Sequence, residues 1–216
     1  SVQYIAQPVD GFRYGQGDET KPLSAVASGE LTLEDFIAQM TNEELVKIVS
    51  GVSNRGIANT CGWGGIDRLG IPAVMTADGP AGVRFSPKTG IATTAWPCAT
   101  LVACTWNTEL VEKIGIAGAM ECKENNLSVW LAPALNIHRS PLCGRNFEYF
   151  SEDPLVAGRM SAGIVAGAKS KGLITTIKHF VLNEQESHRN GIFTWTDEQT
   201  LREIYLKAFE TPIKES

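Results

Sequence analysis

Short apolar runs alternate with longer amphipathic segments along most of the chain, and this alternation predicts three units of strand, loop and helix. Strands are predicted at residues 73–76, 128–132 and 173–177. Their short, continuous apolar character is typical of strands that are buried on both faces of a sheet. Polar loops follow the strands and lead into segments with apolar residues at helical spacing. Helices are predicted at residues 107–125, 154–171 and about 197–209.

Residues that commonly begin and end helices support these boundaries. Asn107 is a favourable N-cap, Pro154 is a favourable first helical residue, and Gly172 follows the second helix as a stop signal. Repeated units of strand and helix imply parallel strands joined by right-handed crossovers. The predicted fold class is therefore α/β, either a doubly wound sheet or part of a TIM-like (β/α) barrel.

The N-terminal part is predicted to differ from the repeating part. Residues 1–30 are rich in glycine, proline, aspartate and serine and have no sustained apolar period, which is typical of a lead-in or interdomain linker. Two short amphipathic helices are predicted within 32–49, and the second helix begins near Thr41. We therefore expect a linker at 1–30 and the first part of an α/β domain at 31–216.

Composition and charge exclude several classes of partner. The 216-residue chain has a formal charge of −5, and its lysines and arginines are scattered, so nucleic acid is not an expected partner. Its apolar runs are far shorter than the roughly 20 residues of a membrane helix, so no membrane partner is expected either. Five cysteines without CxxC spacing predict unpaired, mostly buried thiols in a cytoplasmic protein, with one adventitious disulfide as the alternative.

Four polar residues follow the predicted strands and would meet at one rim of the sheet if the strands are neighbours. They are Asp78, Arg145, Lys178 and His179. A carboxylate accepts hydrogen bonds from adjacent hydroxyls, while Arg, Lys and His donate to oxygens, so this set suits a polyhydroxylated ligand. Five tryptophans offer flat faces on which a sugar ring could stack, although most are expected in the core.

The same residues also have structural explanations that need no ligand. Asp78 could belong to an ordinary Asp-Gly turn, and Arg145 could pair with Glu148 or Glu152 to hold its own loop. The adjacent basic pair after the third strand is less easily explained, because burial of two such side chains requires partners. The sequence contains no spacing typical of a metal, nucleotide or Ser-His-Asp site, and no cofactor is expected.

Three segments around these residues resemble glycoside hydrolase family 3, in the order and spacing of that family. They are TADGPAGVR at 76–84, GRNFEYFSEDP at 144–154 and KHFVLNEQE at 178–186. The resemblance implies the N-terminal part of a (β/α) barrel in a retaining, β-glucosidase-like hydrolase. It also implies that the non-reducing sugar is bound by Asp78, through its hydroxyls, and by the donors Arg145, Lys178 and His179. The third segment matches the β-glucosidase form, which favours a neutral β-linked glucoside or oligosaccharide.

The resemblance also implies that the groups that perform the reaction lie outside this chain. Retaining glycosidases need a carboxylate nucleophile and an acid/base roughly 5–5.5 Å apart. In this family the nucleophile belongs to a Ser-Asp-Trp-like motif, which this sequence does not contain, and the acid/base usually comes from another domain. Glu184 and Glu186 match supporting positions. No catalytic residue is therefore assigned, and the isolated chain is expected to be an inactive piece of a longer enzyme.

Two other functions stay open from the sequence. One is a non-catalytic carbohydrate-binding or sensing module, and the other is an unrelated α/β enzyme, which motif residues facing apart would favour. A parallel sheet cut after its third or fourth strand also exposes edges and apolar faces. We therefore expect self-association, or pairing with the remainder of the enzyme. The sequence does not choose between a glucoside and a xyloside.

Overall fold

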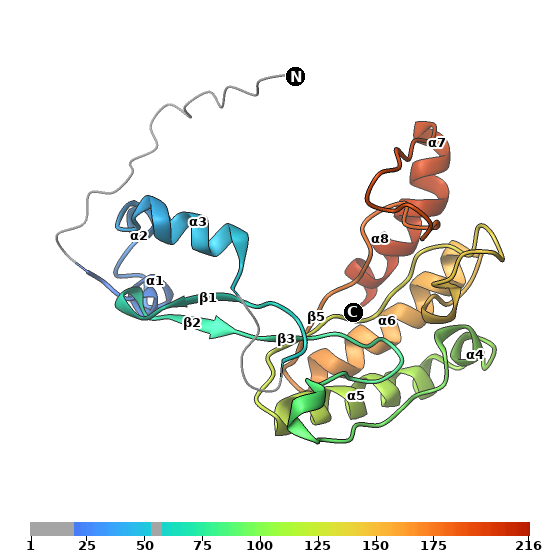
Figure 1. The fold of residues 1–216 in the computed structure, drawn as a ribbon, viewed down its shortest axis with the longest axis horizontal. Helices are drawn as coiled ribbons and strands as arrows, with labels where there is room; N and C mark the ends of the chain where they lie inside the picture. The colour runs from blue at the N-terminus through green and yellow to red at the C-terminus, as the bar shows by residue number, and fades with distance from the viewer. Residues whose placement is uncertain (1–19, 53–57) are drawn as a thin grey trace. The chain divides into compact units, whose positions relative to one another are not determined.

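The computed structural model describes residues 20–52 and 58–216, which fall into two compact units (Figure 1). Within the described part, the first unit contains residues 20–52 and 61–74, and the second contains 58–60 and 75–216. No helix in these ranges is long and apolar enough to cross a membrane. The predicted linker lies mostly outside the described residues, so its boundary stays a prediction.

The first unit begins with three short helices. They are α1 (Leu23–Ala27), α2 (Leu33–Ala38) and α3 (Asn42–Ser50). The Thr32 hydroxyl caps α2, and Thr41 and Glu44 form a reciprocal capping box at the start of α3. The two helices predicted within 32–49 are thus confirmed. Helix α1 corrects the irregular structure expected before residue 30, because a five-residue helix leaves too short an apolar pattern to detect.

An antiparallel hairpin completes the first unit and corrects the first predicted strand. Strand β1 (Trp63–Ile66) pairs with β2 (Ile71–Val74), and the short 3-10 helix η1 (Asp67–Leu69) connects the two strands. The strand predicted at 73–76 was wrong in its bounds, because Ala73 and Val74 belong to this hairpin. The hairpin was missed because two glycines interrupt β1, and both have positive φ angles that break the usual strand pattern.

The second unit contains the parallel sheet that the repeating pattern predicts. Its strands are β3 (Thr76–Ala77), β4 (Val129–Trp130) and β5 (Ile174–Thr175), in that order across the sheet. Thr76 lies opposite Val129, and Val129 lies opposite Ile174, so each strand is in register with its neighbour. The three strand ends therefore reach the same edge, as expected.

Helices follow β3, β4 and β5 in the second unit. They are α4 (Ala99–Ala103), α5 (Thr108–Glu124), α6 (Pro154–Ser170), α7 (Glu198–Thr200) and α8 (Leu206–Glu215), with the π-helical turn η4 (Leu201–Tyr205) between the last two. Asn107 and Asp153 cap α5 and α6 through their side chains, which confirms both predicted helix starts. The helix predicted to end near residue 209 continues to Glu215, because Pro212 lies within α8 without ending it. The sequence pattern did not predict α4.

Helices α5 and α6 pack side by side with their backbones in contact (Figure 1). A Cβ atom placed on Gly115 of α5 would overlap the backbone of Ile164, and one on Gly167 of α6 would overlap the backbone of Glu112. Beneath them, the fully buried Trp130 of β4 packs against Gly118. Glycine at these positions lets two β/α units share one tightly packed core.

Cys98, Cys104, Cys122 and Cys143 form no disulfide, but the five cysteines are not mostly buried as expected. Cys122 and Cys143 are buried, Cys98 is half-buried, and Cys61 and Cys104 are exposed. Burial, together with the nearby Glu121 charge, raises the pKa of the Cys122 thiol to about 12, so this side chain is a neutral part of the core. The expectation failed because Cys61 and Cys104 lie outside the regular strands and helices.

Candidate functional site

The four predicted site residues meet at the carboxyl edge of the parallel sheet. Asp78 directly follows β3, and Lys178 and His179 follow β5. Lys178 extends the sheet through a parallel bridge to Ala134, in the loop after β4. Arg145 comes from the same loop, just before the 3-10 turn η3 (Asn146–Glu148). The expected convergence is therefore observed, while the role of these residues toward a ligand stays a prediction.

The Asp78 carboxylate is clamped between two cations. Lys178 Nζ, on a side chain only 12% exposed, donates to one carboxylate oxygen, which also accepts the Gly79 N–H at 2.8 Å. Arg84 donates to the other oxygen. Burial alone would raise the pKa of Asp78, but the Lys178 hydrogen bond and charge outweigh it and hold that pKa below its usual value. Asp78 is therefore a fixed anionic acceptor, more than an ordinary turn residue.

Arg84 is a site residue to which the sequence assigned no role. It ends the first family-like segment, six positions after Asp78, and its N–H donates to the Asp78 carbonyl at 2.8 Å. Gly79 and Gly82 between them have positive φ angles and no room for a Cβ atom, so the segment folds back on itself. This return places the guanidinium beside the carboxylate. The two glycines were the sequence signal for such a turn.

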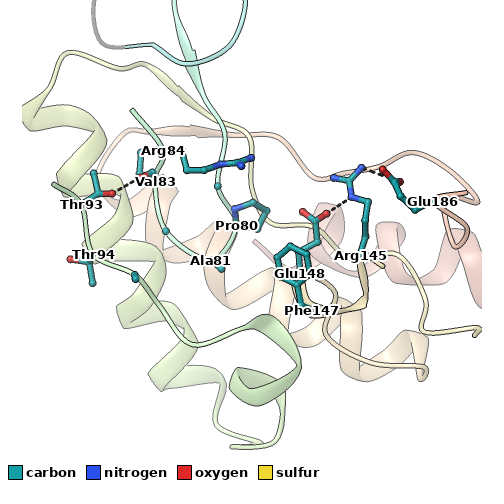
Figure 2. A pocket seen from close by; sticks show the side chains of 13 residues that line it. Pro80, Ala81, Val83, Arg84, Thr93, Thr94, Arg145, Phe147, Glu148 and Glu186 are labelled. Carbon is teal, nitrogen blue, oxygen red and sulfur yellow. Dashed lines mark hydrogen bonds and ion pairs between the residues drawn. The ribbon is translucent and has the colours of Figure 1, made fainter. Parts of the chain in front are cut away.

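Arg145 makes both a structural contact and a contact within the site. Its Nε donates to the buried Glu148, as the structural explanation from sequence proposed. Its Nη2 lies 2.8 Å from His179 Nε2, and its Nη1 lies 3.8 Å from a carboxylate oxygen of Glu186. Figure 2 shows Arg145 between the two glutamates. Pairing with Glu148 therefore orients the guanidinium without removing it from the site.

His179 is held by hydrogen bonds at both of its ring nitrogens. Besides Arg145, the ring contacts Tyr149 Oη at 3.2 Å and Asn136 Oδ1 at 3.3 Å, both through Nδ1. Burial, with the nearby charges of Arg145 and Lys178, lowers the pKa of His179 to about 3. The ring is therefore neutral at physiological pH.

Glu184 is buried, and its carboxylate accepts hydrogen bonds from within the protein. Its Oε1 accepts the Ile137 N–H at 3.3 Å and an Asn136 Nδ2–H at 3.4 Å, and the side chain is 3% exposed. Burial raises the pKa of Glu184 despite these donors. The supporting role that the resemblance implies for Glu184 stays a prediction.

A cavity of about 430 Å³ opens beside Arg84 and Arg145, and its volume is within the roughly 300–1,000 Å³ range of ligand pockets. Arg145 is the one of the four predicted site residues that lines it. Its lining comprises residues 79–84, 93–95, Arg145, Phe147, Glu148 and Glu186 (Figure 2). The arrangement offers hydrogen-bond donors from two arginines and acceptors from two carboxylates. Within residues 20–52 and 58–216, no group of three or more His, Cys, Asp or Glu side chains is placed to hold a metal ion.

The stability of the chain is expected to depend on pH through His179. An unfolded histidine takes up a proton below about pH 6.5, whereas the folded ring resists protonation until about pH 3. This contribution to the free energy of unfolding is therefore full above pH 6.5 and is lost as the pH falls toward 3. Asp78, Arg145, Lys178 and Arg189 are the charged groups that act on the ring.

Urea unfolding of the wild type and of His179→Gln at neutral and mildly acidic pH would measure this contribution. The free-energy difference between the two proteins should shrink as the pH falls. The raised pKa of Glu184 has the opposite effect, because it favours folding at lower pH, but it is common to both proteins and cancels in the difference. A difference that is the same at both pH values would contradict the prediction.

Comparison with known proteins confirms the family that the three sequence motifs resemble. A family model described as the glycosyl hydrolase family 3 N terminal domain matches residues 64–216. Beta-glucosidase A of Butyrivibrio fibrisolvens is 51% identical over 215 residues, which cover 98% of this chain and 26% of the relative. The chain thus spans about a quarter of the length of this relative.

Solved structures of other proteins are similar to this chain in both fold and sequence. The beta-glucosidase from Paenibacillus barengoltzii has a TM-score of 0.85 at 39% identity, covering 94% of this chain and 23% of that one. Beta-glucosidase 3B from Thermotoga neapolitana, solved in complex with glucose, has a TM-score of 0.78 at 43% identity, covering 84% and 27%. These likenesses confirm the predicted α/β class, a partial (β/α) barrel with parallel strands. With its three ordered motifs inside the matched region, the chain belongs to glycosyl hydrolase family 3.

Proposed function

We propose that this chain supplies the subsite for the non-reducing sugar in a retaining β-glucosidase that hydrolyses β-linked glucosides. The observation that carries the proposal is the Asp78 carboxylate, held anionic between Lys178 and Arg84 at the rim where the three family motifs meet. The beta-glucosidase names of the relatives and the glucose complex of the Thermotoga protein support a glucoside as the substrate.

In this proposal the sugar is bound by several side chains at the rim of the sheet. Asp78 accepts hydrogen bonds from ring hydroxyls, and Lys178, Arg84 and Arg145 donate to hydroxyl oxygens. Such charge-assisted bonds are about twice as strong as neutral ones, and they fix the sugar for attack at its anomeric carbon. The nucleophile and the acid/base are contributed from outside this chain. The expected self-association and cytoplasmic location stay predictions.

A chimeric enzyme would test the proposed function. The region of the Butyrivibrio fibrisolvens relative that matches this chain would be replaced by residues 1–216, and release of the aglycone from an aryl β-glucoside would be measured. We expect the chimera to hydrolyse the β-glucoside and to leave the matching aryl α-glucoside intact. The parental relative provides the positive control.

The 216-residue chain alone provides the second arm of the test. It should release no aglycone, because its sequence lacks the nucleophile motif. Turnover by the chain alone would return attention to Glu184 and Glu186 as reacting carboxylates. A chimera that folds, as judged by circular dichroism, but releases no aglycone from any aryl β-glycoside would overturn the proposed function.

A further inference from the structure

The protonation state of His179 is determined by the groups around it. Arg145 carries only hydrogen-bond donors, and its Nη2 lies 2.8 Å from His179 Nε2. This short contact requires a bare Nε2 that accepts the guanidinium N–H, since two N–H groups facing each other would repel. In a neutral ring the proton must then be on Nδ1.

The surroundings of Nδ1 agree with that assignment. Nδ1 lies 3.3 Å from the carbonyl oxygen Oδ1 of Asn136 and 3.2 Å from the Tyr149 hydroxyl. The Tyr149 hydroxyl can donate its own proton to the Asn183 carbonyl at 3.3 Å, which leaves its lone pairs for the ring. Both neighbours of Nδ1 are therefore able to accept. Each ring nitrogen already has a partner within the protein.

The orientation of the Asn136 amide is fixed just as firmly. Its Oδ1 accepts the backbone N–H of His179 at 2.7 Å, and its Nδ2 donates to the His179 carbonyl at 3.0 Å. A second Nδ2 contact reaches Glu184 Oε1 at 3.4 Å. A flipped amide would direct Nδ2 at the His179 N–H, and Oδ1 at the His179 carbonyl and the Glu184 carboxylate. Asn136, which is 1% exposed, therefore presents an acceptor to Nδ1.

We propose that His179 and Asn136 are positioning residues: Asn136 holds His179 as the Nδ1–H tautomer, and the bare Nε2 then accepts from Arg145 and aims its guanidinium into the site. In this arrangement His179 orients Arg145 toward a ligand. Glu148 fixes Nε of the same guanidinium, so two of its sides are anchored. Nη1, which lies 3.8 Å from Glu186, and the second N–H of Nη2 are the groups that can reach hydroxyl oxygens. Only the identity of the ligand rests on the proposed function.

The tautomer can be measured in the 216-residue chain without any sugar. Uniform ¹⁵N labelling of histidine and a long-range ¹H–¹⁵N correlation distinguish a protonated ring nitrogen from a bare one. The chain has three histidines, which single His→Gln substitutions would assign. His138 serves as an internal contrast, because its Nε2 faces the carbonyl oxygens of Asn146 and Tyr149 at 2.9 Å and must be the protonated nitrogen.

We expect His179 to show a bare Nε2 and a protonated Nδ1 at neutral pH, whereas His138 shows a protonated Nε2. Arg145→Met should remove the donor to Nε2 and shift the His179 spectrum toward a mixture of tautomers. Arg84→Met is the matched control, because it removes a guanidinium that contacts Asp78 and not His179, and it should leave the tautomer unchanged. Asn136→Ala should relax the tautomer as Arg145→Met does.

A protonated Nε2 on His179 in the folded wild type would overturn the proposal without any need for a variant. An Arg145→Met spectrum identical to that of the wild type would also overturn it, because the guanidinium would then not set the ring. Failure of the chimera to hydrolyse glucosides, together with the expected tautomer, would instead contradict the proposed function and leave this inference standing. The two conclusions are therefore tested separately.

Discussion

Asp78→Asn in the chimeric enzyme is expected to lower kcat/KM for an aryl β-glucoside by roughly 10²–10⁴-fold. Each hydrogen bond from a sugar hydroxyl to a charged acceptor contributes about 1.5–3 kcal/mol, and the loss of two such bonds gives this range. The amide would also leave Lys178, which is largely buried, without its counter-ion. Steady-state kinetics with the same substrate would measure the effect.

Asp67→Asn is the matched control for this substitution. Asp67 lies exposed in the turn of the first unit's hairpin, and the same chemical change there should leave kcat/KM unaltered. Circular dichroism of both variants would separate a defect of the site from unfolding. If folded Asp78→Asn retained the kcat/KM of the unsubstituted chimera, the carboxylate would not be a sugar acceptor.

Gly167→Ala is expected to cause a large loss of stability for its size. The added methyl group would overlap the Glu112 carbonyl oxygen and would lie 2.9 Å from the Ile116 nitrogen, both of which are backbone atoms of α5. No side-chain rotation relieves such a contact, so α5 and α6 must move apart. Overpacking of this kind costs about 1–3 kcal/mol, which corresponds to a fall in Tm of roughly 2–12 °C for a chain of this size.

Gly144→Ala provides the comparison for this prediction. Gly144 has no atom within 4 Å of an added Cβ and no positive φ angle, so the same substitution there should leave Tm unchanged. Thermal unfolding followed by circular dichroism would measure both variants. Equal Tm values for the two variants would show that the helix contact is looser than the structure indicates.

Local patterns were sufficient to predict the repeating part of the fold. The apolar runs, together with Asn107 and Pro154, predicted parallel strands and the two long helices, because these features depend on residues close in sequence. The β1–β2 hairpin was missed because Gly64 and Gly65 remove the side chains that would mark a strand. The end of the last helix was missed because Pro212 lies inside α8.

The candidate site was predictable in its members but less so in their partners. Asp78, Arg145 and the Lys178–His179 pair were found because each follows a strand. Asn136 gave no such signal, since a single asparagine in a polar loop has many ordinary explanations. Its role depends on contacts with residues 43 and 48 positions away. Such long-range contacts are set by the tertiary fold, which a local pattern does not encode.

The clamp on Asp78 also determines when the site can form during protein synthesis. Lys178 lies 100 positions after Asp78, and chains are made at roughly 5–20 residues per second. About 5–20 s therefore pass on the ribosome between the addition of the carboxylate and the addition of its main cation. Arg84, only six positions away, is the partner that is made first. The turn from Asp78 to Arg84 can form early, because both residues are made within a short time. The Asp78–Lys178 ion pair can form only after the start of the third β/α unit has been synthesised.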